Sequence, residues 1–413
     1  MFPVSKFTIL KSCTTKKLEE LIYKKNKAVL MRVALFNVEL KDDLIPVPYL
    51  PRSKCMREVD GKYVNSIYKG TFDNGRVLTA EVIAQVTLTD IDYKILKSQY
   101  KFDMDIITVA TARYGKLPQP LRDTVLNYYK NKTDLKDKPS DEEHSKEFYK
   151  LLYDKTKQLL NAQYGMTAQD PVKQSIKYVD GAEDLYKDEE EYPQKLLELH
   201  NNRAFLAYQW GVWVTARARE HLQKGIDLCG INFVYCDTDS CKYIGDTVDW
   251  EILNKEARKN AEKNKTYAID PNGKKHYMGM FEIEDHIKQF KTMGSKKYAY
   301  IDDNNILHIT IAGVNKKIGA IELKRAASVK YGPPDNPLKY MDEGFIFKYA
   351  GGLEARYSDH PEEKGITEYI TKDNVPIRIT RNVSLVENTK TLGLTAEYRD
   401  LLTVSHKKLL IDL

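Results

Sequence analysis

Short runs of alternating apolar and polar residues fill the first part of the chain, most clearly in MRVALFNVEL and VLTAEVIAQVTLTDI. A period of two turns one side of a strand toward a core and the other side toward solvent. Proline and glycine interrupt these runs at Pro46, Pro48, Pro51, Gly70 and Gly75. The pattern over residues 30–95 therefore predicts antiparallel strands joined by turns.

Helical patterns take over in the middle of the chain. Residues 121–157 are rich in lysine and are broken by the polar segment KDKPSDEEHSKE, which predicts two helices separated by a loop. The segment AFLAYQWGVWVTARAREHLQKGI predicts a longer helix whose aromatic residues pack in a core. Between them, the polar residues 171–204 with an acidic run at 188–191 predict a surface insertion.

The last part of the chain returns to strands. Residues 278–313 read as strands and loops, and GPPDNP reads as a linker to a small mixed domain from residue 330 onward. Separate strand-rich and helix-rich regions indicate the α+β class. With 413 residues, 42% of them hydrophobic, the chain can form more than one core, so several subdomains are expected.

Net charge, cysteine and histidine spacing, and the length of apolar runs indicate which partners and which compartment are compatible with the chain. The 65 Lys and Arg against 59 Asp and Glu give a net charge of +6, which permits a nucleic-acid partner without requiring one. Five cysteines without C-x-x-C spacing indicate reduced thiols, and eight scattered histidines do not indicate a zinc site. The N-terminus has no signal-peptide pattern, and no apolar run approaches the ~20 residues that span a bilayer. A cytoplasmic protein without a membrane partner is expected.

The segment NFVYCDTDSCKYI places two aspartates between two alternating runs. A strand, a tight turn and a second strand fit this spacing, and a period of two would point Asp237 and Asp239 to the same side. Two adjacent carboxylates repel each other, and a divalent cation such as Mg²⁺ relieves that repulsion. A bare D-x-D is better explained by an Asx turn without a metal, but the longer string Y-x-D-T-D-S favours a metal site.

A second group of polar residues lies upstream, in KQLLNAQYG. On a helix, Lys157, Asn161 and Tyr164 fall at i, i+4 and i+7 on one face, and Gly165 is placed to end the helix. The lysine would contact the phosphates of a nucleoside triphosphate, and the tyrosine would stack near its base or sugar. The alternative is an ordinary amphipathic surface. The presence of the paired aspartates favours the nucleotide site.

These two strings, K-x-x-x-N-x-x-Y-G and Y-x-D-T-D-S, resemble signature motifs of family B DNA polymerases. The resemblance is greatest to the protein-primed branch encoded by bacteriophages and related mobile elements. GSKKYAYID, with Lys296, Lys297 and Tyr298, resembles the K-x-Y motif of that family, and WVTARAR and AGVNKK also fit. The similarity covers essentially the whole chain, in the expected order.

The resemblance implies a right-hand architecture, with an antiparallel palm sheet, helical fingers and a small thumb. It places a strand-rich palm edge that contacts a terminal protein at 1–115 and fingers at 116–170. A strand-separating insertion would occupy 171–204, followed by the palm at 205–329 and the thumb at 330–413.

The resemblance also implies template-directed addition of dNTPs to a primer end with two Mg²⁺ or Mn²⁺ ions. Asp239 would bind metal directly, and Asp237 would bind or position it. The residues implied to bind nucleotide are Lys157, Asn161, Tyr164 and Lys132, the last of which is also explained as a solvated helix lysine. The residues implied to bind the primer or DNA are Lys296, Lys297, Tyr298 and Arg219.

One departure from the family is serious. Its first catalytic motif, an aspartate followed by S-L-Y-P or S-S-Y-P, is absent from these residues, as is the proofreading exonuclease domain. In the family that motif lies just upstream of a segment resembling FPVSKF, which here begins at Phe2. Two expectations follow. The chain is the C-terminal part of a polymerase in a bacterial host cytoplasm, with primer-template DNA, dNTP, a terminal protein and an N-terminal polymerase fragment as partners, or it is a non-catalytic DNA-binding piece.

Overall fold

A computed structural model describes residues 1–168, 207–328, 334–357 and 383–394, together with the strands 175–178, 185–190, 366–370 and 376–380; for 175–190 and 353–386 it describes the backbone alone. The chain divides into two compact units. The first comprises the described residues within Met1–Gln169 and Phe205–Glu282, and the second those within Asp170–Ala204 and Ile283–Leu413.

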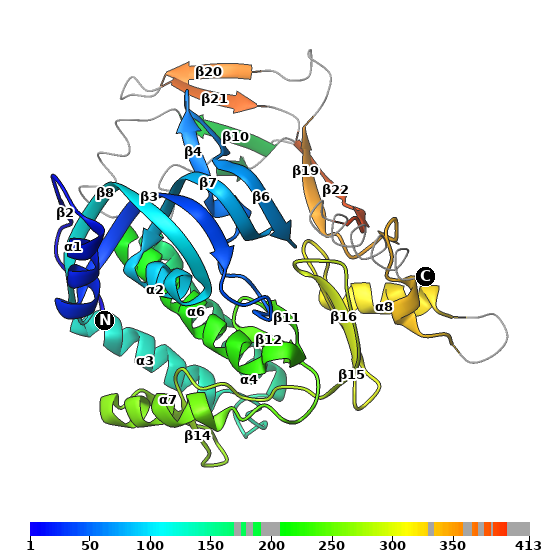
Figure 1. The fold of residues 1–413 in the computed structure, drawn as a ribbon. Coiled ribbons are helices and arrows are strands. Elements are labelled where there is room, and N and C mark those ends of the chain that lie inside the picture. The colour runs from blue at the N-terminus through cyan, green and yellow to red at the C-terminus, as the bar shows by residue number, and fades with distance from the viewer. Residues whose placement is uncertain are drawn as a thin grey trace, which may run out of the picture. The chain divides into compact units, whose positions relative to one another are not determined.

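The first unit contains a large sheet followed by helices and short hairpins (Figure 1). Its elements are β1 (Phe2–Pro3), β2 (Thr8–Ile9), α1 (Thr15–Glu19), β3 (Lys27–Leu40), β4 (Met56–Val59), β5 (Lys62–Asn65), β6 (Ile67–Asp73), β7 (Arg76–Thr89), α2 (Asp90–Gln99), β8 (Tyr100–Gly115), α3 (Gln119–Asp134), α4 (Lys146–Gly165), α6 (Tyr208–Cys229), β11 (Phe233–Asp237), β12 (Ser240–Tyr243), α7 (Glu251–Asn264), β13 (Tyr267–Ile269) and β14 (Lys275–Tyr277).

The large sheet of the first unit is antiparallel, which confirms the prediction from alternation. Among the described residues it has six strands in the order β1–β8–β3–β7–β6, with β2 paired to β8. The predicted run of strands is wrong at its end, because β7 stops at Thr89 and α2 begins at Asp90. The Thr89 hydroxyl accepts from the Asp92 N–H, and the Asp92 carboxylate accepts from the Thr89 N–H. This capping box starts the helix.

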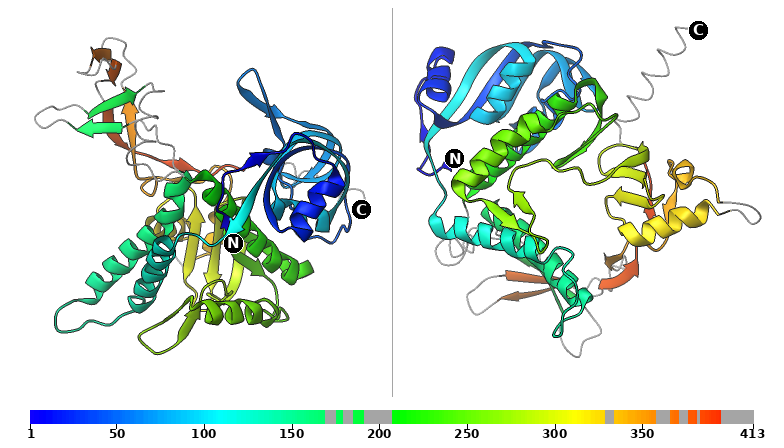
Figure 2. Two further views of the ribbon diagram at one scale, coloured as in Figure 1. Left: turned by 90° about the vertical axis from the view of Figure 1, so that its left-hand side faces the viewer. Right: turned by 90° about the horizontal axis from the view of Figure 1, so that it is seen from below.

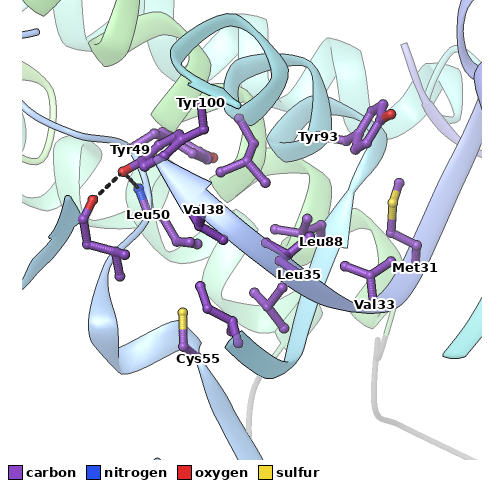
Figure 3. Packing of buried hydrophobic residues seen from close by; sticks show 14 of the residues in the cluster. Met31, Val33, Leu35, Val38, Tyr49, Leu50, Cys55, Leu88, Tyr93 and Tyr100 are labelled. Carbon is purple, nitrogen blue, oxygen red and sulfur yellow. Dashed lines mark hydrogen bonds between the residues drawn. The ribbon is translucent and has the colours of Figure 1, made fainter. Parts of the chain in front are cut away.

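The main core of the first unit lies on one side of this sheet (Figure 3). Val33 and Leu35 from β3 and Leu88 from β7 are fully buried there, as are Leu18 from α1 and Tyr93 from α2. Apolar burial of this kind stabilises by about 25 cal/mol per Å². It fixes α2 against the sheet that precedes it in the chain.

Helix α6 packs on α2 and on the edge of the sheet. Trp213 is 1% exposed, and its indole N–H donates to the Tyr114 hydroxyl over 2.7 Å. That hydroxyl donates in turn to the buried Asp90 carboxylate over 2.7 Å. Burial, the largest cause, raises the pKa of Asp90 despite the Tyr114 hydrogen bond. The predicted core role of the aromatic residues is confirmed for Trp213.

Two helices joined by a loop, as predicted, follow the sheet. Helices α3 and α4 lie side by side (Figure 2). Ser145 caps the start of α4, where its hydroxyl accepts from the Phe148 N–H. The helix ends at Gly165. Gly165 does not adopt a left-handed cap, because the chain continues into a 3₁₀ turn at Met166–Ala168.

The second unit has its own core. Its elements are β9 (Ser175–Tyr178), β10 (Leu185–Glu190), β15 (Ile287–Thr292), β16 (Lys297–Asp302), β17 (Leu307–Ile311), α8 (Lys316–Ala326), β18 (Ile346–Phe347), β19 (Leu353–Tyr357), β20 (Ile366–Ile370), β21 (Pro376–Thr380), β22 (Val383–Glu387) and β23 (Lys390–Thr391). In the part of the chain that is described, β15, β16 and β17 form an antiparallel sheet covered by α8, with Leu323 and Met341 fully buried.

The strands predicted within 278–313 are therefore confirmed. Most of the predicted insertion at 171–204 lies outside the described residues, although β9 and β10 within it pair antiparallel. No helix in the described ranges is both long enough and apolar enough to cross a membrane.

Candidate active site

The paired aspartates lie at the tip of the β11–β12 hairpin, as the sequence predicts. Asp237 is opposite Ser240, and Cys236 is opposite Cys241. Strand β11 ends at Asp237, so Asp239 lies in the turn and not on a strand. The sequence pattern predicts, from strand alternation, that both side chains point to the same side. This reason is wrong, because Asp239 is not on a strand and the turn determines the direction of its side chain.

Hydrogen bonds to Asp237 fix the turn. Its carbonyl accepts from the Asp239 N–H over 2.6 Å and from the Ser240 hydroxyl over 3.2 Å. Thr238 has a φ of 55°, a left-handed conformation that is uncommon for a β-branched residue. Asp239 is exposed and Asp237 is partly exposed. The turn thus presents carboxylate oxygens to solvent on a constrained backbone.

Helix α6 packs against this hairpin. A Cβ added to Gly225 would lie 3.3 Å from the Cys241 sulfur, which shows how closely the helix and β12 pack. Burial, followed by the charge of Asp237, raises the pKa of the Cys236 thiol. A raised pKa disfavours the thiolate form of Cys236 at neutral pH.

The predicted nucleotide-binding face is exposed on α4. Lys157, Asn161 and Tyr164 all reach solvent, with Tyr164 49% exposed. Lys132 is in the last turn of α3 and is partly buried. Just after the C-terminal end of α4, in the 3₁₀ turn, the Ala168 Cβ would lie 2.9 Å from a Cβ added to Gly211 of α6. Helix α6 thus packs against the end of α4 and also against the aspartate hairpin.

Of the predicted primer-binding residues, Lys296 is exposed, whereas Tyr298 is buried. Lys296 is exposed in a left-handed conformation with φ of 53°, just before β16. The Lys297 ammonium donates to the Gly393 carbonyl. Tyr298 is only 7% exposed, with its ring 5.7 Å from that of Phe290. These three residues belong to the second unit.

Arg219, the fourth predicted DNA-binding residue, belongs to a polar cluster around the buried Asp92 that the sequence did not reveal. Its guanidinium donates to Asp92 over 2.9 Å and to the Tyr49 hydroxyl over 3.2 Å. The Lys54 ammonium lies 3.1 Å from the same carboxylate oxygen, and the Tyr49 hydroxyl also donates to it. Burial alone would raise the pKa of Asp92, but Lys54 and Arg219 hold it well below its usual range. Only the T-x-x-D capping pattern at Thr89 could have pointed to Asp92.

The hairpin offers two carboxylates, which are the type of ligand that a magnesium ion prefers. Across the described ranges, no three His, Cys, Asp or Glu side chains gather into a group that could hold a metal. Asp237 and Asp239 offer hard oxygen donors at an open turn. Mg²⁺ is commonly held by one or two carboxylates, with waters and substrate phosphates completing its shell.

Comparison with solved structures relates this fold to DNA polymerases. The chain is similar to Phi29 DNA polymerase in its ternary complex with primer-template DNA and incoming nucleotide, with 17% identity and a TM-score of 0.54. It is also similar to that polymerase bound to single-stranded DNA, with 16% identity and a TM-score of 0.51. The matches cover 95% of this chain and 54–55% of the polymerase, so the chain spans about half the polymerase's length. No protein-family model and no curated protein matches the chain.

The fold of this chain is therefore similar to that of about half of Phi29 DNA polymerase. The structures that carry this conclusion are those of Phi29 DNA polymerase. At 16–17% identity the likeness concerns the fold alone.

Proposed function

We propose that this chain is the nucleotidyltransferase part of a DNA-directed DNA polymerase, which adds dNTPs to a primer end on a template. The observation that carries the proposal is the Y-x-D-T-D-S string at an exposed hairpin tip, on a fold similar to Phi29 DNA polymerase. Helix α6 supports it further, because it packs against both this hairpin and the end of the helix that bears Lys157.

Six of the ten predicted residues have a specific chemical task in this proposal. Asp237 and Asp239 would hold Mg²⁺, which when bound offsets negative charge on phosphate oxygens. The Lys157 ammonium would pair with the triphosphate, and the exposed Tyr164 ring would stack on base or sugar. Exposed Lys296 would contact the primer end, while buried Tyr298 would hold the turn that carries it.

A second candidate function is a DNA-binding subunit that needs another segment for catalysis. Two-metal phosphoryl transfer holds its ions between carboxylates that face each other. Here the two candidate ligands, Asp237 and Asp239, come from one turn. A carboxylate supplied in cis or by a separate chain, in the context D-x-x-S-x-Y-P, would complete such a site.

Primer extension separates these two functions. The full chain would be incubated with primer-template DNA, dNTPs and Mg²⁺, alone and with a segment carrying D-x-x-S-x-Y-P. We expect negligible extension by the chain alone and extension after the addition, which Asp239→Asn should abolish. Extension that persists in Asp239→Asn would refute the assignment of the hairpin carboxylates as the metal ligands of the active site. DNA binding without extension in either mixture would favour the DNA-binding subunit.

A further inference from the structure

Three cations of the first unit surround one carboxylate and one tyrosine. Lys54 and Arg219 both contact Asp92 Oδ1, over 3.1 Å and 2.9 Å. Arg76, from the start of β7, donates from Nη1 to the Tyr49 carbonyl over 3.0 Å. We name Lys54, Arg76 and Arg219 the cation cluster.

The described ion pairs of the cation cluster involve one carboxylate. Asp92 is 2% exposed and pairs with Lys54 and Arg219. Asp73 is opposite Arg76 in the β6–β7 pairing, yet no ion pair within 4.0 Å joins them in the described part of the chain. Three cations therefore share one paired carboxylate. Burial, the largest cause, lowers the pKa of Lys54, and the charges of Arg219 and Arg76 lower it further. The charge of Asp92 raises this pKa and offsets part of the decrease.

The cluster is open to a ligand. The side chains of Lys54 and Arg219 are 26% and 35% exposed. The described hydrogen bonds of Arg219 use Nε and Nη2, and that of Arg76 uses Nη1, which leaves further guanidinium donors for a ligand. The two-pronged arrangement of guanidinium donors matches the oxygens of a phosphate group.

The cluster also lies close to the aspartate hairpin. Arg219 lies on α6, six residues before Gly225, which is a rise of about 9 Å along the helix. A Cβ added to Gly225 would lie 3.3 Å from the Cys241 sulfur of β12, so the helix that carries Arg219 also packs on the hairpin. A phosphate held by the cluster would therefore lie near the turn that bears the paired carboxylates.

We propose that Lys54, Arg76 and Arg219 bind a phosphate group of the nucleic-acid backbone beside the aspartate hairpin, and that Asp92 and Tyr49 position these cations. The inference rests on the proposed function and adds Lys54 and Arg76 to its substrate contacts. Two buried acceptors hold three cations at fixed places, so the site exists before the nucleic acid arrives. The shared chemistry is a phosphate, which a nucleic-acid backbone or a free dNTP could supply.

The test measures how salt weakens binding of the full chain to fluorescent primer-template DNA, without dNTP. Each neutralised phosphate contributes about 0.9 to the slope of log K against log salt concentration, so Arg76→Gln and Lys54→Gln should each reduce the slope by about 0.9. At about 50 mM salt we expect each variant to bind roughly tenfold more weakly. Arg76→Lys and Lys54→Arg keep the charge and should keep the slope.

Lys69→Gln is the matched control, because exposed Lys69 pairs with Glu81 on the same sheet. It should leave the slope unchanged, and thermal melts would check that all variants are folded. Slopes that equal the wild-type slope would overturn the site while leaving the proposed function in place. With the D-x-x-S-x-Y-P segment supplied, a variant that binds DNA normally but needs more dNTP for extension would assign the bound phosphate to the nucleotide, which also overturns the proposal. No DNA binding by the wild-type chain would overturn both.

Discussion

At the scale of single residues, two kinds of aspartate in the first unit have opposite environments. Asp92 is 2% exposed and is held by Lys54 and Arg219, so its charge is used within the fold. Asp239 is exposed on a turn whose backbone is fixed by Asp237. Removal of a buried, paired carboxylate destabilises the fold because it leaves its partner charges uncompensated, whereas two exposed carboxylates on a constrained turn are suited to a metal ion.

The first residue-scale prediction concerns Asp92→Asn. The folded protein holds the pKa of Asp92 well below its unfolded value, so the stabilisation is complete above about pH 4 and is lost as pH falls toward the folded pKa. At pH 7 the substitution leaves Lys54 and Arg219 without their shared carboxylate and should lower the free energy of unfolding by about 3 kcal/mol. Urea unfolding from neutral to acidic pH measures this.

The difference between wild type and Asp92→Asn should shrink as the pH falls below about 4. Asp303→Asn is the control for the loss of a carboxylate, because Asp303 is exposed, and it should change the free energy of unfolding by less than about 0.5 kcal/mol. A difference for Asp92→Asn that stays constant from neutral to acidic pH would contradict the ion-pair account.

The second residue-scale prediction concerns Lys157→Ala. If Lys157 pairs with the triphosphate, its loss should raise the dNTP concentration needed for extension by roughly tenfold while DNA binding changes little. Lys155→Ala is the matched control, since Lys155 is exposed on α4 but lies about 200° around the helix from Lys157. Equal effects of the two substitutions would favour an ordinary amphipathic surface. The assay is the dNTP titration of the chain with its D-x-x-S-x-Y-P segment supplied.

At the scale of elements, α6 determines how the candidate site is built. Its first turns pack on the residues that follow α4, and its last turns pack on β12. Glycines permit both contacts: a Cβ on Gly211 would lie 2.9 Å from Ala168, and one on Gly225 would lie 3.0 Å from the Phe281 ring. The helix carrying Lys157 and the hairpin carrying Asp239 are therefore connected through one element.

The element-scale prediction compares two glycines. Gly211→Ala should destabilise the protein by about 1–3 kcal/mol, because the new methyl overlaps Ala168 and Thr167. Gly165→Ala, at the end of α4, meets no atom within 4 Å and should stabilise slightly, by about 0.5 kcal/mol. Thermal and urea unfolding would measure both. A Gly211→Ala variant as stable as wild type would show that α6 does not pack tightly there.

Local pattern was sufficient for most elements, but not for their tertiary partners. The alternation around β3 and β7, the two helices α3 and α4 and the aspartate hairpin follow from spacing alone. The start of α2 was missed because Thr89 and Asp92 interrupt an apolar run by capping, not by a change of period. The pairing of Asp92 with Arg219 spans 127 residues of sequence, and no local signal encodes such a contact.

At the scale of the whole molecule, the chain has two units with separate hydrophobic cores. The first is centred on the large sheet, with Leu35 fully buried, and the second on the β15–β17 sheet and α8, with Leu323 fully buried. The candidate metal and nucleotide residues lie in the first unit, and the candidate primer residues Lys296 to Tyr298 lie in the second. The proposed reaction therefore needs both units folded at once.

The whole-molecule prediction is that the two units unfold as separate steps, because each has a core of its own. Leu35→Ala and Leu323→Ala each remove a fully buried side chain and should each cost about 3 kcal/mol in their own unit. Leu35→Ala should lower the unfolding midpoint of the first unit and leave the other step in place, and Leu323→Ala should do the reverse. Calorimetry detects both steps, and a tryptophan fluorescence melt follows the first unit, which holds Trp210, Trp213 and Trp250. One transition that shifts as a whole in both variants would show that the two cores fold cooperatively, and primer contacts in the second unit would then be coupled to the stability of the aspartate hairpin in the first.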